Sequence, residues 1–172
     1  MEKESVILVD SNDKEIGYEE KYAAHRHPTK LHRAFSVFIF NSAGKMLITK
    51  RNCDKKTWPG FWSNACCSHP RKGEKTEDGA PRRIKEELGI CVPLNYLFKF
   101  EYSASYDKMH GENEVDHVFA GKFDGEIAAD KSEIDDWKFV DVNELKNDIR
   151  KNPDKYTPWF KICIDRVLKE KK

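Results

Sequence analysis

The sequence predicts an α+β fold in which a mixed β-sheet packs between helices, within a single domain spanning residues 1–172. The chain is long enough to bury a core of its own without disulfide bonds. Short runs of β-branched and aromatic residues dominate the sequence, and helical patterns are interspersed among them, mostly in its later part. No repeat or linker-like stretch divides the chain.

The first predicted strands lie in the N-terminal third. A short apolar run, residues 6–9, ends in the turn-like sequence SNDKE. The aromatic and β-branched run 34–40 (AFSVFIF) is followed by NSAG and then by MLITKR. This order predicts a β-hairpin in which Gly44 adopts a positive φ angle.

A helix is predicted over residues 78–88 (DGAPRRIKEEL). Asp78 is the expected N-cap, because that start leaves Pro81 in the first turn, where its missing N–H is harmless. Gly89 follows the last helical residue and suits the left-handed position that ends many helices.

The second half of the chain alternates between strand and helix patterns. Further strands are predicted over residues 96–102, 114–123 and 137–140. The sequence from Asp141 to Glu144 is typical of a capping box that opens a short helix. Thr157 and Pro158 are expected at the N-cap and first position of a last helix.

The composition excludes several classes of protein. A formal net charge of +1 disfavours a general nucleic-acid or membrane-surface binder, which needs a basic excess. No apolar run approaches the roughly 20 residues of a membrane span, and MEKESVILVD lacks the apolar segment of a signal peptide. The five cysteines are odd in number and irregularly spaced, so we expect free thiols in a reducing cytoplasm. Cys53, Cys91 and Cys163 are expected to be small buried hydrophobes.

Histidines and carboxylates form the first chemical signal. The segment SNACCSHP, residues 63–70, places two thiols next to an imidazole, and three more histidines lie at positions 25, 27 and 32. In HGENEV, His110, Glu112 and Glu114 would share one face of an extended segment. Two carboxylates on one face need a cation or a shared proton, which suits a Mn, Fe or Zn site. The alternative is a chance scatter of surface residues in a highly charged chain.

The helix over 78–88 gives a second signal. Arg82 and Glu86, and Arg83 and Glu87, are four positions apart and therefore share a face. They could form two intrahelical ion pairs, each contributing roughly 0.2–0.5 kcal/mol. Alternatively, Arg83 could bind a diphosphate while Glu87 holds Mg²⁺ against it. The helix alone does not decide between these interpretations.

Taken together, the motifs resemble those of the type I isopentenyl-diphosphate isomerases, a branch of the Nudix superfamily. The matching segments are EKYAAHRHPTKLHRAFSVFIF, KRNCDKKTWPGFWSNACCSHP, RRIKEELG, ENEV and TPWF. The resemblance implies a Nudix-type fold, with mixed sheets sandwiched between helices. The Nudix box itself is altered, because Ser68 takes its first Gly position and Arg82-Arg83 replaces the usual Arg-Glu pair.

The resemblance also implies a reaction, in which isopentenyl diphosphate is isomerised to dimethylallyl diphosphate through a tertiary carbocation, in isoprenoid biosynthesis. The implied catalytic residues are Cys67, Glu114 and Tyr102, and a glutamate–tyrosine donor with a cysteine base is the favoured order. The implied ligands of one Mn²⁺ or Zn²⁺ are His25, His32, His69, Glu112 and Glu114. Glu87 is the implied ligand of a Mg²⁺ that accompanies the substrate diphosphate. The implied substrate-binding residues are Lys21, Arg51, Lys55, Ser68, Arg83 and Trp159.

Two other functions compete with the isomerase. A Nudix pyrophosphohydrolase would share the fold, Mg²⁺ and Glu87, but it leaves no role for Cys67, the histidines or Glu114. A non-catalytic metal- or nucleotide-binding module would tolerate the loss of Cys67. For the isomerase we expect a small diphosphate substrate, no nucleic-acid or membrane partner, and a monomer in the cytoplasm.

Overall fold

The computed structural model describes residues 4–171, and its central strand is β3 (His32–Phe40). Almost every residue of β3 is buried, as its continuous apolar run requires. One edge of β3 pairs in parallel with β8 (Gly111–Lys122) over its whole length. Its other edge pairs in turn with β1 (Ser5–Val9), β6 (Cys66–Ser68) and β4 (Met46–Arg51).

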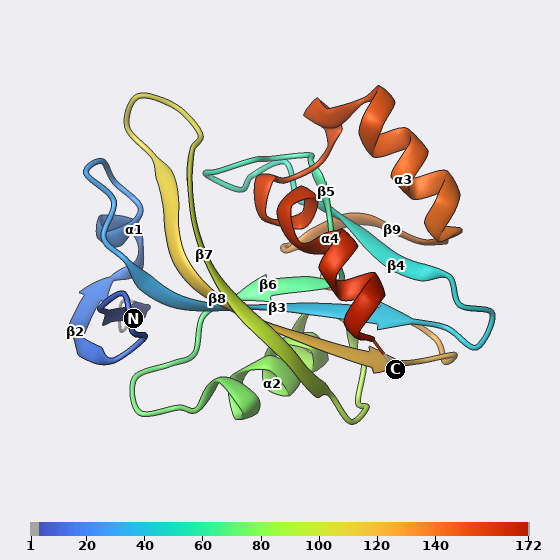
Figure 1. Cartoon of the computed structure of the whole chain (residues 1–172), viewed down its shortest axis with the longest axis horizontal. Helices are drawn as coiled ribbons and strands as arrows, with labels where there is room; N and C mark the ends of the chain where they lie inside the picture. The colour runs from blue at the N-terminus through green and yellow to red at the C-terminus, as the bar shows by residue number, and fades with distance from the viewer. Residues whose placement is uncertain (1–3, 172) are drawn as a thin grey trace.

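The remaining strands extend this mixed sheet outward (Figure 1). The long strand β7 (Asn95–Ser105) pairs antiparallel with β8. On the far side, β9 (Ile134–Val140) and the two-residue β5 (Trp62–Ser63) pair with β4. At the N-terminal end, β2 (Glu15–Glu20) forms a hairpin with β1, and the single turn α1 (Lys21–Ala24) follows it directly.

Helices cover both faces of the sheet (Figure 1). The helix α2 (Thr76–Leu88) packs Ile84 and Leu88 against Phe35 on one face of β3. On the other face, α4 (Pro158–Glu170) packs Phe160 against Phe38. The helix α3 (Val142–Lys151) and the short 3₁₀ turn η1 (Pro153–Lys155) precede α4. The predicted α+β arrangement of a mixed sheet between helices is therefore confirmed.

The predicted hairpin after β3 is correct only at its turn. Gly44 has a φ angle of 74° and donates to the Asn41 carbonyl at 2.9 Å. However, β3 and β4 pair only at Phe40 and Met46. The two strands then diverge, because β3 continues between β8 and β6 while β4 joins β9.

Of the predicted helix starts, that of α2 is wrong and that of α4 is correct. The helix α2 begins at Thr76, two residues before the predicted start, and Lys75 is its N-cap. Pro81 therefore lies inside the helix, where it removes one backbone hydrogen bond. Thr157 is the N-cap of α4 and Pro158 lies in its first turn, as predicted, although the Thr157 hydroxyl lies 2.8 Å from the Ser63 hydroxyl and makes no capping hydrogen bond.

Other local predictions agree with the structure. Asp141 caps α3 by accepting from the backbone N–H groups of Asn143 and Glu144. The strands predicted over 96–102, 114–123 and 137–140 correspond to β7, β8 and β9. The segment SNACCSHP shows no strand pattern, yet it contains part of β5 and all of β6.

The cysteines are all free, but two of them contradict the expected burial. Cys163 is buried, whereas Cys53 and Cys91 are exposed. Within residues 4–171, no helix combines the length and the apolar character needed to cross a bilayer.

Candidate active site

A cavity of about 350 Å³ opens where the ends of β3, β6 and β8 meet the loops that precede α2 and β9. Apart from the fully buried His32, every residue expected at the site lines it: Lys21, His25, Arg51, Lys55, Cys67, Ser68, His69, Arg83, Glu87, Tyr102, Glu112, Glu114 and Trp159. Residues that are scattered along the sequence therefore converge on one pocket.

Cys67 lies on β6, opposite Ser36 of β3. Its Sγ is 3.0 Å from the Asn64 Oδ1 and 3.0 Å from the Trp159 Nε1. Burial and the nearby Asp116 carboxyl raise the pKa of the Cys67 thiol to about 12. The thiol is therefore protonated at neutral pH and donates its hydrogen to the Asn64 carbonyl oxygen.

Glu114 lies on β8, beside His32 of β3 and opposite Tyr102 of β7. Its Oε2 accepts a hydrogen bond of 2.6 Å from the Tyr102 hydroxyl. Its Oε1 lies 3.0 Å from the His69 Nε2 and 3.4 Å from the His32 Nε2. Burial alone would raise the pKa of Glu114, but the hydrogen bonds with His32 and His69 hold it well below its usual range.

Three imidazoles and one carboxylate form a candidate metal centre. One ligand atom from each of His25, His32, His69 and Glu114 lies within 4.8 Å of the other three. The Nδ1 atoms of His25 and His32 lie 2.6 and 2.8 Å from the carbonyl oxygens of Lys21 and Lys30. When the rings are neutral, the N–H donated to these carbonyls is on Nδ1, and each Nε2 is then free to act as a metal ligand.

The nitrogen positions fit a metal ion. The Nε2 atoms of His32 and His69 are 3.2 Å apart. Two ring nitrogens this close need a proton or a cation between them. Imidazole and carboxylate donors without thiolate suit a divalent transition metal. The residues of this cluster can therefore hold such an ion.

Glu112, His110 and His27 lie outside the four-residue cluster and have other contacts. The Glu112 Oε2 lies 2.8 Å from the His25 Nε2, but the direction of approach makes no hydrogen bond. Glu112 thus adjoins the cluster without belonging to its closest group of four. His110 pairs with Asp107 and is not one of the four, but it lines the same cavity as Glu112 and Glu114, so the three side chains of HGENEV share a face as predicted. His27 lies 3.1 Å from Ser105 and is also outside the cluster.

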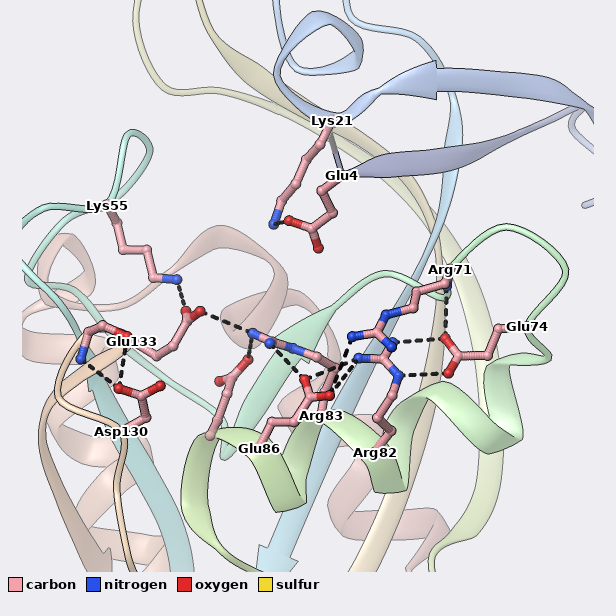
Figure 2. Close-up of polar contacts among 12 residues, drawn as sticks. Glu4, Lys21, Lys55, Arg71, Glu74, Arg82, Arg83, Glu86, Asp130 and Glu133 are labelled. Atoms are coloured by element: carbon pink, nitrogen blue, oxygen red, sulfur yellow. Dashed lines mark hydrogen bonds and ion pairs between the residues drawn. The ribbon is translucent and has the colours of Figure 1, made fainter. Parts of the chain in front are cut away.

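The other end of the cavity carries the cations (Figure 2). Arg83 pairs with Glu87 four positions along α2, and also with Glu133 at 3.2 Å. Lys55 pairs with the same Glu133, whereas Lys21 pairs with Glu4 at 3.0 Å. The predicted pairs on α2 thus form, and Arg83 lines the cavity as well.

Arg51 is positioned by backbone rather than by a carboxylate. Its guanidinium donates to the carbonyl oxygens of Thr57 and Trp58 at 3.0 and 3.1 Å. It also lies over the Trp159 ring, 5.4 Å from the centroid. The Trp58 ring packs edge-on against the Trp159 ring, with 5.3 Å between the ring centroids. The cavity therefore has an aromatic side next to Cys67 and a cationic side next to Glu87.

Sequence reasoning missed four residues around the site. Ser36 donates to Asp116 at 2.7 Å, and its hydroxyl lies 3.6 Å from the Cys67 Sγ. Asp116 continues the alternation of Glu112 and Glu114 along β8, so the spacing held a usable signal. Asn64 and Glu133 gave no such signal, because neither lies in a periodic pattern.

Comparison with known proteins decides the family. Residues 30–160 match the NUDIX domain. The isopentenyl-diphosphate Delta-isomerase 1 of Aromatoleum aromaticum is 47% identical over 166 residues, which cover 96% of this chain and 93% of that protein. The chain belongs to the isopentenyl-diphosphate Delta-isomerases, within the NUDIX family.

A second relative agrees with this isomerase assignment, and a solved structure agrees with the fold. The isopentenyl-diphosphate Delta-isomerase of Serratia proteamaculans is 40% identical over 157 residues, covering 91% of this chain and 87% of its own. The crystal structure of a MutT NUDIX hydrolase from Burkholderia pseudomallei has a TM-score of 0.64 and 20% identity, covering 80% of this chain and 98% of that one. At that identity it shows the NUDIX fold alone. The isomerase is thus favoured over the competing hydrolase.

Proposed function

We propose that Cys67 and Glu114 carry out the two proton transfers with the substrate as this isomerase converts isopentenyl diphosphate to dimethylallyl diphosphate. The relatives named as isopentenyl-diphosphate Delta-isomerases support the reaction. The observation that supports the residues is geometric: the Cys67 thiol and the Glu114 carboxylate both line the same cavity, from strands on opposite sides of β3.

The reaction requires an acid and a base. A proton adds to the terminal carbon of the alkene, and a tertiary carbocation forms at the neighbouring carbon. A base then removes a proton from the next carbon, and the electron pair of that C–H bond becomes the new double bond. The Cys67 thiol and the Glu114 carboxyl, on strands at opposite edges of β3, would supply the acid and the base.

The aromatic side of the cavity suits the carbocation. Trp159 is buried, and its indole nitrogen contacts the Cys67 sulfur at 3.0 Å. A desolvated cation against an indole face is stabilised by about 2 kcal/mol. The wall also excludes water, which would trap the cation as an alcohol.

The cationic side suits the diphosphate. We assign Lys21, Arg51, Lys55, Arg83 and Ser68 to phosphate oxygens, because all five line this cavity. Glu87 would hold Mg²⁺, which neutralises phosphate charge when bound. His25, His32, His69, Glu112 and Glu114 would hold Mn²⁺ or Zn²⁺, which fixes the orientation of the Glu114 carboxylate when bound.

The cellular setting is part of the same proposal. Five free cysteines support a reducing compartment, for which we propose the cytoplasm. The monomeric state and the lack of nucleic-acid and membrane partners stay predictions from the sequence.

A deuterium experiment tests the proton transfers. The protein is incubated with isopentenyl diphosphate, Mg²⁺ and Mn²⁺ in D₂O, and the product is analysed by mass spectrometry. We expect deuterium in dimethylallyl diphosphate and a loss of at least about 1000-fold in rate for Cys67→Ala. Cys53→Ala, at an exposed position outside the cavity, is the matched control and should keep the wild-type rate. Phosphate release, or a Cys67→Ala variant with near-normal turnover, would contradict the proposal.

A further inference from the structure

We propose that Glu133 is a built-in counter-ion that competes with the substrate diphosphate for Lys55 and Arg83, and so makes diphosphate binding depend on Mg²⁺. This inference rests on the proposed function, in which these two cations bind the diphosphate. Glu133 has no role in the reaction described above.

The carboxylate bridges two cations with its two oxygens (Figure 2). The Glu133 Oε2 pairs with the Lys55 ammonium, and the Oε1 lies 3.2 Å from the Arg83 Nη2. A phosphate group presents oxygens in a similar arrangement and needs the same donors. The phosphate and the Glu133 carboxylate therefore compete for the Lys55 ammonium and the Arg83 Nη2.

Glu133 is held in place by the chain on either side of it. Its carbonyl oxygen accepts from the Asn52 N–H at 3.0 Å, and its own N–H donates to the Asp130 carbonyl at 3.0 Å. Burial alone would raise the pKa of Glu133, but Lys55 and Arg83 lower it, so the group is an anion at neutral pH. The counter-ion is thus a fixed negative charge at the rim of the cavity.

The other charges at this end add to the effect. Glu87 contacts the same Arg83 nitrogen as Glu133, and Lys21 is paired with Glu4. Three of the four assigned cations are therefore already paired with carboxylates, and only Arg51 is held by carbonyl groups. A diphosphate that enters alone brings several negative charges against Glu87 and Glu133. A divalent cation that enters with it offsets this repulsion, so the two ligands should strengthen each other's binding.

Binding of inorganic pyrophosphate tests the inference. Its dissociation constant is measured by calorimetry with and without Mg²⁺, for the wild type and Glu133→Gln. Because glutamine keeps the size but not the charge, we expect Glu133→Gln to bind pyrophosphate at least about fivefold more tightly without Mg²⁺. For Glu133→Gln, the dissociation constant without Mg²⁺ should therefore exceed the one with Mg²⁺ by a smaller factor than in the wild type.

Glu74→Gln is the matched control. Glu74 pairs with Arg82, one position from Arg83, and it contacts neither Lys55 nor Arg83. This variant should leave both dissociation constants unchanged, which excludes a general effect of net charge. Melting temperatures of all variants verify that the proteins are folded.

Two results separate failure of this inference from failure of the proposed function. If Lys55→Ala weakens pyrophosphate binding but Glu133→Gln does not strengthen it without Mg²⁺, the competition is refuted while the phosphate site stands. If Lys55→Ala and Arg83→Ala both bind pyrophosphate normally, the phosphate site itself is wrong. A Glu133→Gln variant weakened only in the presence of Mg²⁺ would make Glu133 a magnesium ligand and also overturn the inference.

Discussion

At the scale of single residues, the carboxylate of Glu114 has its two oxygens in different environments. One faces the imidazoles of the candidate metal centre, and the other accepts from the Tyr102 hydroxyl. The phenol hydrogen bond is the contact that fixes the carboxylate on the side away from the histidines. Tyr102 is therefore a positioning group whose loss should affect proton transfer more than metal binding.

Tyr102→Phe removes this hydroxyl and keeps the ring. A hydrogen bond to a charged group contributes about 1.5–3 kcal/mol, so kcat should fall by about 10- to 100-fold. The KM for isopentenyl diphosphate and the bound transition metal, measured by atomic spectroscopy, should stay near wild-type values. Loss of the metal in Tyr102→Phe would show instead that the phenol supports the metal centre.

Site residues that lie in family motifs could be predicted from the sequence, whereas site residues outside any motif could not. Cys67, Glu114 and the three metal-centre histidines lie in recognisable motifs, and they meet in one cavity. Ser36 and Asn64 contact the thiol only because β3 and the β5–β6 turn are adjacent in space. Such contacts depend on strand pairing, which no local pattern encodes.

At the scale of elements, α2 contains two residues that disfavour a helix, Gly79 and Pro81, and only one of them is explained by packing. Pro81 lies inside the helix and lacks the N–H that would bond to the preceding turn. Gly79 faces the sheet, where a Cβ would lie 3.1 Å from Phe35 Cε1 and 3.0 Å from Glu74 Oε2. The close packing disfavours a side chain at Gly79, whereas no contact of this kind favours the proline.

We therefore expect opposite effects from two alanine substitutions. Pro81→Ala restores a backbone hydrogen bond and should raise the free energy of unfolding by about 1 kcal/mol, after the added entropy of the unfolded chain is subtracted. Gly79→Ala should lower it, although alanine is the better helix former. Urea denaturation of both variants checks this, and a lower stability for Pro81→Ala would contradict the interpretation of α2.

Element boundaries were the weaker part of the sequence-based prediction. The strands β7, β8 and β9 were predicted because each is long or strongly β-branched and aromatic. The start of α2 was misplaced because Asp78 is a better N-cap residue than Lys75, yet packing of the first turn prevails over that preference. The pairing of β3 with β8 rather than β4 could not be read from a turn signal alone.

At the scale of the whole molecule, Asp13 connects the N-terminal hairpin to the sheet. Its carboxylate pairs with Arg33 of β3 at 2.7 Å, Lys99 of β7 at 2.9 Å and His117 of β8 at 2.8 Å. Burial would raise the pKa of Asp13, but these partners lower it below its usual value of 3.8. A carboxyl with a lowered folded-state pKa stabilises the fold above pH 3.8, and this contribution is lost as the pH falls through the folded-state pKa.

Asp13→Asn should therefore destabilise the protein in a pH-dependent way. Asparagine tolerates the left-handed φ of 64° at this position, so backbone strain does not contribute. The melting temperature should drop at pH 7, by an amount equivalent to about 1–2 kcal/mol, and the difference from wild type should disappear in acid. A difference that is the same at pH 7 and in acid would show that the charge of Asp13 is not what stabilises the fold.

The parallel pairing of β3 with β8 has a consequence for how activity arises during synthesis. The thiol, the three imidazoles and three of the four assigned cations are all made before residue 70, but Glu114 belongs to a strand that ends at Lys122. Closing so long a loop is slow, because its entropic cost must be met before the strands can pair. A nascent chain on the ribosome therefore carries the cysteine and the histidines of the candidate metal centre long before Glu114 can join them. Because Trp159 lies on α4, which follows β8, the cavity is complete only after the last helix has packed as well.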